Sequence, residues 1–380
     1  MVYKDEGSLK TELYTKDTDR NSPLLYNSCH PPKMRDSLPS SQLLRVRRIV
    51  VDEHVDHRLN EMHHKFKENN LTAVTEFFLL GFQVSQGLRH FLFCVFLVVY
   101  CGTICGNLLI ITLVSTSKTL HTPMYYFISQ LSISDILLTT NIVPNLLHIL
   151  LNNGGTITFI GCFAQFCFFG VADTSECLLL SLMSYDRYVA ICNPLHYASI
   201  MTISRCVILG AMCWLFAFSI VIIEIISTAK LIFCGPNTID HLFCDMVPLL
   251  ELACSDTSIV HLEIYLIGIP IILIPTAIIV MSYTYIVLAI LRIPSISGRQ
   301  KAFSTCSSHL IVVSIFYWTL FCVYVVPTKG QTVTMSKILS LLYTVLTPLV
   351  NPIIYSLRNK DIKKAVHKVV NRFFPLWAGT

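Results

Sequence analysis

Long apolar stretches dominate the chain after its first 70 residues. Five of them contain no Lys, Arg, Asp or Glu: 90–117, 206–223, 264–291, 302–328 and 338–357. Two more are apolar but interrupted by charged residues, namely 123–151 and 162–192. Because a helix needs about 20 mostly apolar residues to cross a bilayer, the pattern predicts seven membrane-spanning helices. We place them at 90–115, 123–150, 162–192, 204–226, 260–288, 303–326 and 335–356.

The composition also favours a membrane protein. Hydrophobic residues make up 53% of the 380 residues and charged residues 13%, with a mean hydropathy of +0.62. A soluble domain usually carries about 25% charged residues, so this chain has too few to cover a water-soluble globule of its size. The net charge of +5 is small and no basic stripe is interleaved with aromatic residues, so no nucleic-acid partner is expected.

The first 70 residues form a polar head. They hold 12 of the 28 Lys and Arg and 11 of the 23 Asp and Glu, which leaves 16 and 12 for residues 71–380. The head has neither a long apolar stretch nor the core of a signal peptide, and we expect it to be disordered. The sequence therefore predicts an extracellular extension (1–70), a seven-helix domain (71–357) and a cytoplasmic tail (358–380).

Basic residues in the short loops indicate which side of the membrane each loop occupies. The outer loops hold only Lys230 and Lys329 if the head lies outside. The inner segments then hold five basic residues, before those of the tail: Lys118, Arg205, Arg292, Arg299 and Lys301. The N-terminus is therefore expected outside and the C-terminus inside. In the tail, apolar positions such as Ile362 and Val366 oppose basic ones, which predicts a short amphipathic helix on the inner leaflet and membrane lipid as a partner.

Six ionisable residues fall inside the predicted spans: Asp135, Asp173, Glu176, Asp186, Arg187 and Glu224. A charge at the bilayer centre costs roughly 2.5–3.5 kcal/mol, so each requires a partner or a function. Asp135 and Glu176 both lie mid-span, and two neighbouring buried acids imply a shared proton or a bound cation such as Na⁺. The alternative is that each is hydrogen-bonded separately to a neighbouring helix. No other cofactor or metal is expected.

Two further features lie near the ends of the predicted spans. Pro352 follows Asn351 in the seventh span, removes a helix hydrogen bond and permits a kink, so that Asn351, Pro352 and Tyr355 form a candidate switch. Four cysteines face the outer side: Cys162, Cys234, Cys244 and Cys254. They can form two disulfides in an oxidising compartment, and all three pairings stay open at this point.

Several motifs now resemble a known family. They include Gly106-Asn107, LHTPMYYF at 120–127, LSISD at 131–135, MSYDRYVAICNPLHY at 183–197, KAFSTCSSHL at 301–310 and PLVNPIIYSLRNKDIKKA at 348–365. Their joint order and spacing resemble the vertebrate olfactory receptors, which are rhodopsin-like G-protein-coupled receptors. The resemblance runs from about Asn70 to Arg372 and implies an all-α membrane protein: a seven-helix bundle followed by a short amphipathic C-terminal helix.

The resemblance assigns roles by position. It implies the disulfides Cys162–Cys244 and Cys234–Cys254 and an N-glycan on Asn70 in the sequon Asn70-Leu71-Thr72. Asp135 and Glu176 would form the mid-membrane ion or proton site. A larger set would form the switch that opens for the G protein: Asp186, Arg187, Tyr188, Tyr283, Asn351, Pro352 and Tyr355.

Helical spacing within this resemblance places a ligand pocket in the outer half of the bundle. Its expected lining comes from the third and sixth spans: Phe169, Gly170, Asp173, Thr174, Tyr317, Leu320, Phe321 and Tyr324. The alternative for each residue is packing against another helix. Asp173 departs from the family pattern by placing an acid on the pocket side. One hypothesis is that it selects amine or polar odorants, and the other is that it shares a proton or ion with Glu176.

The resemblance implies an odorant receptor of the plasma membrane and not an enzyme. A small volatile ligand would favour one of two helix arrangements, and an olfactory-type stimulatory G protein would then raise cyclic AMP. Three alternatives stay open. One is a rhodopsin-like receptor for a non-odorant ligand outside the nose, and another is a transporter or channel, which would need a polar path across the whole membrane. The third is a non-functional or unexpressed product. The head is longer than is usual in the family, and the receptor-like part could also begin at Met62.

Overall fold

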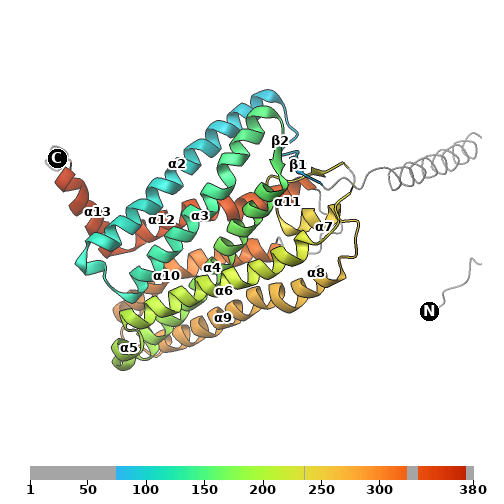
Figure 1. Ribbon diagram of the computed structural model, residues 1–380. Helices are drawn as coiled ribbons and strands as arrows, with labels where there is room; N and C mark the ends of the chain where they lie inside the picture. Colours follow the sequence, from blue (N-terminus) through green and yellow to red (C-terminus); the bar gives the residue numbers. More distant parts are fainter. Residues whose placement is uncertain (1–73, 235, 323–332, 374–380) are drawn as a thin grey trace, which may run out of the picture. The chain divides into compact units, whose positions relative to one another are not determined.

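Helices that run side by side make up most of the described chain (Figure 1). The structure is a computed structural model that describes residues 74–234, 236–322 and 333–373. Seven helical segments form the bundle: α2 (Gln86–Thr116), α3 (Pro123–Asn152), α4 (Phe159–Cys192), α6 (Ile203–Ala229), α8 (Ser258–Glu263) continued by η2 (Ile264–Gly268) and α9 (Ile269–Leu291), α10 (Ile296–Leu320), and α11 (Val333–Leu341) continued by η4 (Leu342–Leu346) and α12 (Thr347–Arg358).

These segments confirm the predicted seven-helix class. Six of them are long and apolar enough to span a membrane, and the bent α10 makes the seventh. Their bounds extend the predicted spans by a few residues at several ends. The agreement follows from the bilayer itself, because helices satisfy every backbone hydrogen bond internally and need a set length to cross it.

The two ends of the bundle differ. One end, called the sheet end below, carries a small sheet and a short helix, α7 (Met246–Leu252) (Figure 1). The sheet has the order β2-β1-β3, with β1 (Glu76–Leu79) antiparallel to β2 (Gly155–Thr158) and parallel to β3 (Thr238–Ile239). The opposite end, called the tail end, carries α5 (Pro194–Ile200), the short η1 (Lys118–Leu120) and α13 (Lys360–Phe373).

The sheet was not predicted. β1 alternates exposed and buried residues, so that Phe77 and Leu79 are buried while Glu76 and Phe78 are exposed. This is the period of a half-buried strand. Four residues are too short for the pattern to stand out, and the partners of β1 lie about 80 and 160 residues further along the chain.

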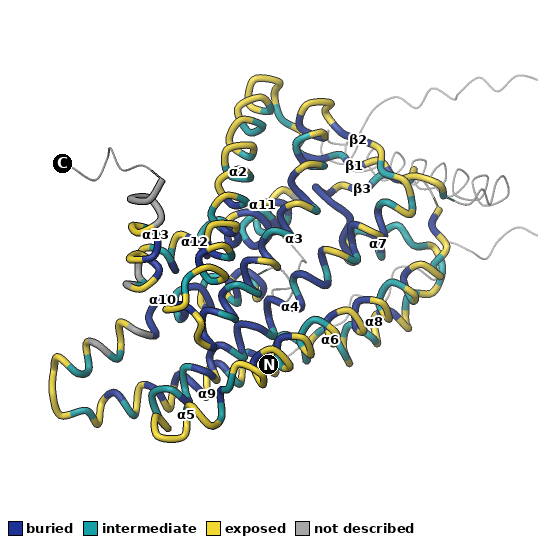
Figure 2. Tube along the Cα trace, turned by 60° about the vertical axis from the view of Figure 1, so that its left-hand side comes forward, coloured by how far each residue is buried: buried dark blue, intermediate teal, exposed yellow. Residues whose placement is uncertain are grey.

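The core lies around α4, which Figure 2 shows as largely buried along the middle of the bundle. Small residues let neighbouring helices approach closely, as is common in membrane bundles. A Cβ on Gly106 would lie 3.1 Å from Pro352, and one on Gly170 would lie 3.1 Å from Val221. α2 therefore packs closely on α12, and α4 on α6.

The predicted amphipathic tail helix is present as α13. Ile362 and Ala365 on it are buried, whereas Lys363, Lys364 and Lys368 are exposed. Asn359 precedes α13, and its Oδ1 accepts from the backbone N–H of Asp361 at 3.0 Å. The expected disorder of the head, the glycan on Asn70 and the pocket residue Tyr324 lie outside the described residues.

Candidate functional site

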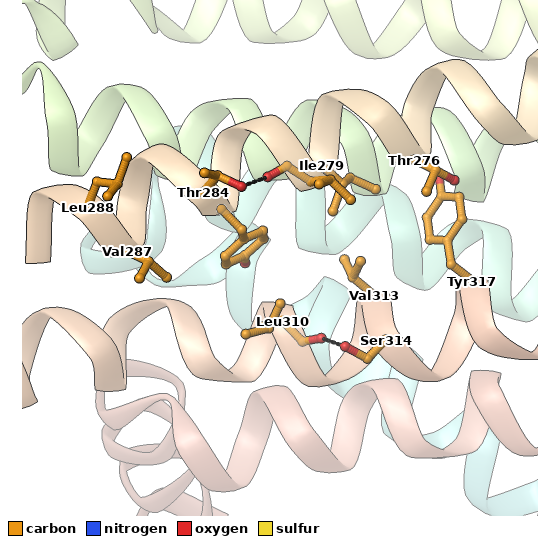
Figure 3. A pocket seen from close by; sticks show the side chains of 11 residues that line it. Thr276, Ile279, Thr284, Val287, Leu288, Leu310, Val313, Ser314 and Tyr317 are labelled. Carbon is orange, nitrogen blue, oxygen red and sulfur yellow. Dashed lines mark hydrogen bonds between the residues drawn. The ribbon is translucent and has the colours of Figure 1, made fainter.

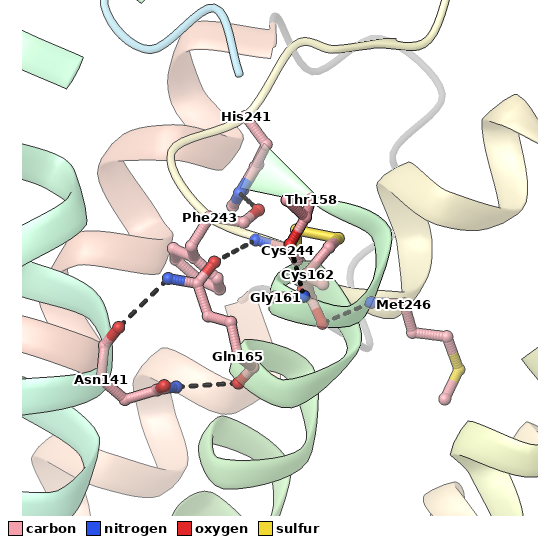
Figure 4. Close-up of a disulfide and its surroundings, with 10 residues drawn as sticks. Asn141, Thr158, Gly161, Cys162, Gln165, His241, Phe243, Cys244 and Met246 are labelled. Carbon is pink, nitrogen blue, oxygen red and sulfur yellow. Dashed lines mark hydrogen bonds between the residues drawn. A yellow bond between two sulfur atoms is a disulfide. The ribbon is translucent and has the colours of Figure 1, made fainter. Parts of the chain in front are cut away.

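A loop segment closes the sheet end of the bundle. We call residues His241, Leu242, Phe243 and Cys244 the lid segment, and all four are buried. Cys244 forms a disulfide with Cys162 near the start of α4 (Figure 4). A second disulfide joins Cys234 to Cys254 within the same loop. The structure thus contains the two pairings that the family resemblance implies.

Gln165 of α4 holds the lid segment by hydrogen bonds (Figure 4). Its Oε1 accepts from the backbone N–H of Cys244 at 3.0 Å, and its Nε2 donates to the carbonyl of Asn141 on α3 at 3.1 Å. Asn141 Nδ2 donates in return to the carbonyl of Gln165 at 2.8 Å. One buried amide therefore links the lid segment to two helices, which the sequence motifs did not reveal.

Aromatic rings place the lid segment over the predicted pocket. The ring of Phe243 lies 5.2 Å from that of Phe169 on α4, and Phe169 lies 6.1 Å from Tyr343 of η4. His241 packs against Phe243 at 4.8 Å. Phe169, which was expected to line the pocket, is thus buried directly beneath the lid segment.

The buried imidazole of His241 contacts both the loop and α11. Its Nδ1 lies 3.2 Å from the carbonyl of Phe243, and its Nε2 lies 3.3 Å from the hydroxyl of Ser340. Burial lowers the pKa of His241 to about 4, and the nearby Lys337 acts in the same direction. The imidazole is therefore neutral at pH 7, with Nδ1–H donating and Nε2 accepting.

Lys337 of α11 joins several segments at the sheet end. Its ammonium donates to the carbonyl of Gly81 at 2.7 Å and also to the carboxylate of Asp240. Gly81 adopts a positive φ of 66°, where a side chain would be strained and would also clash with Ile149. The chain before α2, the loop before the lid segment and α11 are therefore joined by one cation.

The predicted pocket residues are only partly brought together. Phe169, Thr174 and Leu320 are buried, Asp173 is half-buried, and Phe321 is 46% exposed. Gly170 lies against Val221 of α6, which is the packing alternative foreseen for such positions. Tyr317 is half-buried, and its hydroxyl donates to the carbonyl of Cys177 on α4 at 2.9 Å.

A cavity of about 530 Å³ lies between α9 and α10 (Figure 3). Of the seven predicted pocket residues that the structure describes, its lining includes Tyr317 alone. Its lining is otherwise mostly apolar, as in Ile279, Val287 and Val313, and the hydroxyls of Thr284 and Ser314 donate to their own helices. Its size is typical of small-molecule sites, and it runs from Tyr317 toward the tail half of the bundle.

A polar cluster occupies the middle of the bundle. The amide of Asn351 donates to both carboxylate oxygens of Asp135, at 3.0 and 3.2 Å, and to Oε1 of Glu176 at 3.3 Å. All three residues are buried. Asn107 joins the same region by donating to the carbonyl of Pro348 at 3.1 Å. The two acids expected to share a proton or cation thus meet at one amide.

The residues predicted for the switch gather in the tail half. Arg187 forms an ion pair with Asp186, and Asp186 Oδ1 also accepts from the hydroxyl of Tyr197 on α5 at 2.9 Å. Burial, followed by the charge of Asp186, raises the pKa of Tyr197, so its hydroxyl stays a donor. Tyr188 packs against Tyr285 of α9 at 5.8 Å.

Tyr283 contributes to the same region from α9. Its hydroxyl lies 2.7 Å from Nδ1 of His309 on α10, and the two rings are stacked at 6.0 Å. Tyr355 is buried nearby in α12. His309 and Tyr197 lie within the motifs that carry the resemblance, but those motifs give neither residue a role. Only their contacts across the fold identify them.

The bundle has the fold of the rhodopsin-like seven-helix proteins. It superposes on a crystal structure of squid rhodopsin with a TM-score of 0.62 and 19% identity, over 78% of this chain and 88% of that chain. At that identity the likeness establishes the fold alone.

Sequence comparisons identify the family to which the chain belongs within this fold. The family described as "Olfactory receptor" matches residues 93–372. The chain is 48% identical to human Olfactory receptor 11H6, over 78% of this chain and 90% of that protein. It is 45% identical to rat Olfactory receptor 1496, over 80% of this chain and 97% of that protein. The chain belongs to the olfactory receptor family.

A separate match covers the head. Residues 23–71 match a family described as "Animal helix-turn-helix domain". This match ends before the olfactory receptor match begins at residue 93. The head and the receptor part of the chain are therefore similar to different families.

Proposed function

We propose that this protein is an odorant receptor that binds a small volatile molecule near the lid segment and activates a heterotrimeric G protein. The observation that carries the proposal is the olfactory receptor match over 93–372, which includes both the lid segment and the switch residues. Family membership also argues for a receptor and against an enzyme.

The ligand would lie beneath the lid segment, against the sheet-end halves of α4 and α10. Phe169, Thr174 and Leu320 would supply its buried wall, and Tyr317 its floor. An apolar wall suits small volatile molecules, because such sites bind mainly by burying apolar surface. Gln165 and the Cys162–Cys244 disulfide would hold the lid segment so that the pocket keeps its shape.

The ligand would act by favouring one of two helix arrangements. Tyr317 is placed for this role, since its hydroxyl binds α4 while its ring also lines the cavity beside α9. A shift of Tyr317 would move α10 relative to α4. At the tail end, release of Arg187 and Tyr283 from their present partners would open a site for the G protein. The family suggests a stimulatory, olfactory-type G protein and a rise in cyclic AMP.

The placement in the membrane follows from charge. The tail end carries the basic residues of the short loops and of α13, so we propose that it faces the cytoplasm. The sheet end and its two disulfides would then face the oxidising exterior, with the receptor in the plasma membrane. Lipid, the odorant and the G protein are the proposed partners, and we propose no nucleic-acid partner for the receptor part.

The test is a cyclic AMP assay in cells that express the full chain with an olfactory G protein. A broad odorant mixture should raise cyclic AMP, and Arg187→Ala should abolish the rise at equal surface expression. The Arg187 guanidinium is the group expected to meet the G protein, so its loss should leave ligand binding in place. No rise from the wild-type chain at the cell surface, with this mixture and this G protein, would refute the proposal.

A further inference from the structure

Two buried carboxylate oxygens on neighbouring turns of α4 have no hydrogen-bond donor among the described residues. They are Oδ1 of Asp173 and Oε2 of Glu176. The Glu176 side chain is fully buried, and its other oxygen already accepts from Asn351. Because residues three apart lie on one face of a helix, the two acceptors belong to a single site. An unpaired buried acceptor is costly, which indicates a missing partner.

The charges around this site are acidic. Two further acids, Asp245 at the start of α7 and Glu224 on α6, act on Asp173, and Asp173 acts in turn on Glu176. Two basic residues whose side chains are largely buried in the bundle have other partners: Lys337 pairs with Asp240 and Arg187 with Asp186. The site therefore gathers acids and unpaired acceptors, and a group that brings donors and positive charge would complement it.

The lack of hydrogen-bond donors and of positive charge at this site indicates the chemistry of the missing partner. The described residues contain no group of three or more His, Cys, Asp or Glu that could hold a metal ion, so the site is not a carboxylate cage for a divalent metal. An alcohol brings one donor and no charge. A primary ammonium brings up to three N–H donors and one positive charge, and charge-assisted hydrogen bonds of this kind are the strong ones.

We propose that the ligand of this receptor carries a primary or secondary ammonium, which Asp173 binds with Glu176 as its second acceptor. This inference rests on the proposed function and names the chemical class of the odorant. The apolar part of the ligand points toward the sheet end, where Phe169 is buried against Phe243 and Tyr343. Tyr317 does not donate to either carboxylate, since its hydroxyl already donates to the carbonyl of Cys177.

The experiment compares hexylamine with hexan-1-ol on the purified full chain in lipid nanodiscs. These two probes have the same chain length and differ in the head group. Binding is measured by the rise in unfolding temperature with ligand concentration, which needs no signalling. We expect hexylamine to bind at least tenfold more tightly than hexan-1-ol. Asp173→Asn should weaken the binding of hexylamine at least tenfold and leave the binding of hexan-1-ol unchanged.

Two further variants control for folding and for general negative charge. Asp173→Glu keeps the carboxylate and should retain the preference for the amine. Glu251→Gln removes one exposed acid from α7 and should change the binding of neither ligand. Equal binding of amine and alcohol by the wild type would overturn the proposal. So would a Na⁺-dependent stabilisation that Asp173→Asn abolishes and that hexylamine does not displace.

A cyclic AMP arm separates this inference from the proposed function. Binding of hexylamine that depends on Asp173, without any cyclic AMP response, would support the ammonium site and count against the odorant receptor proposal. A wild type that signals with neutral odorants but does not respond to amines would support the odorant receptor proposal and count against the ammonium site. The two proposals can therefore fail independently.

Discussion

Acid should loosen the lid segment through His241. Its side chain is 4% exposed, and its folded-state pKa of about 4 lies below the ordinary value of 6.5. The folded protein therefore binds fewer protons here than the unfolded chain does, so this residue destabilises the fold as the pH falls through 6.5 and continues to do so down to about 4. A shift of this size corresponds to about 3 kcal/mol in full, and about 2 kcal/mol is already lost at pH 5.

The perturbation is His241→Asn. The asparagine amide can still donate to the carbonyl of Phe243, as Nδ1 does over 3.2 Å, but it does not titrate. Unfolding of wild type and variant in nanodiscs is measured at pH 7.5 and at pH 5. Between pH 7.5 and pH 5, the free energy of unfolding of the wild type should fall by about 2 kcal/mol more than that of the variant. Only this difference matters, because other groups titrate equally in both proteins.

An equal loss of stability in the two proteins would refute the reasoning. It would mean that the imidazole is solvated or paired when protonated, contrary to its burial beside Lys337. A smaller loss in the wild type than in the variant would reverse the sign and exclude the neutral imidazole altogether.

Three further predictions concern the bundle and the head. Gly106→Val should destabilise the protein by about 1–3 kcal/mol, because Pro352 leaves no room for a side chain; thermal unfolding checks this, with Gly87→Val as the control at an open position. Asn70→Gln should lower the apparent mass on a gel, and no shift would mean that the sequon is unused. A chain that starts at Met62 should reach the cell surface and signal at least as well as the full chain, and loss of surface labelling would show that the head is required.

The spans could be predicted because the bilayer imposes one physical rule on each of them. A segment such as 264–291 has no charged residue and can be placed without knowing its neighbours. Asp135 and Glu176 could be assigned to one region because both are acids at mid-span depth, and the shared proton or cation expected between them stays a prediction. Asn351 donates to both acids from the seventh span.

The contacts of the sheet end could not be predicted. In the sequence, Gln165 is an ordinary polar residue within the interrupted apolar stretch 162–192. Its role depends on Cys244, which lies 79 residues later in the chain. β1 is recognisable only with its partners β2 and β3 in place. Gly170 was expected at the pocket, but helical spacing gives the face of a residue only relative to its own helix. The position of α6 decides that this face meets Val221.

The hydrogen bond between Tyr283 and His309 gives a last prediction about signalling. It joins α9 to α10 beside the cavity that separates the two helices, so outward movement of α10 would have to break it. His309→Phe keeps a ring that can stack on Tyr283 but removes the acceptor. A bond of this kind stabilises the present arrangement by about 0.5–1.5 kcal/mol. Its loss should raise ligand-free cyclic AMP by a factor of about 2–12 at equal surface expression. An unchanged or lower basal level would show that the bond does not hold the two helices in the silent arrangement.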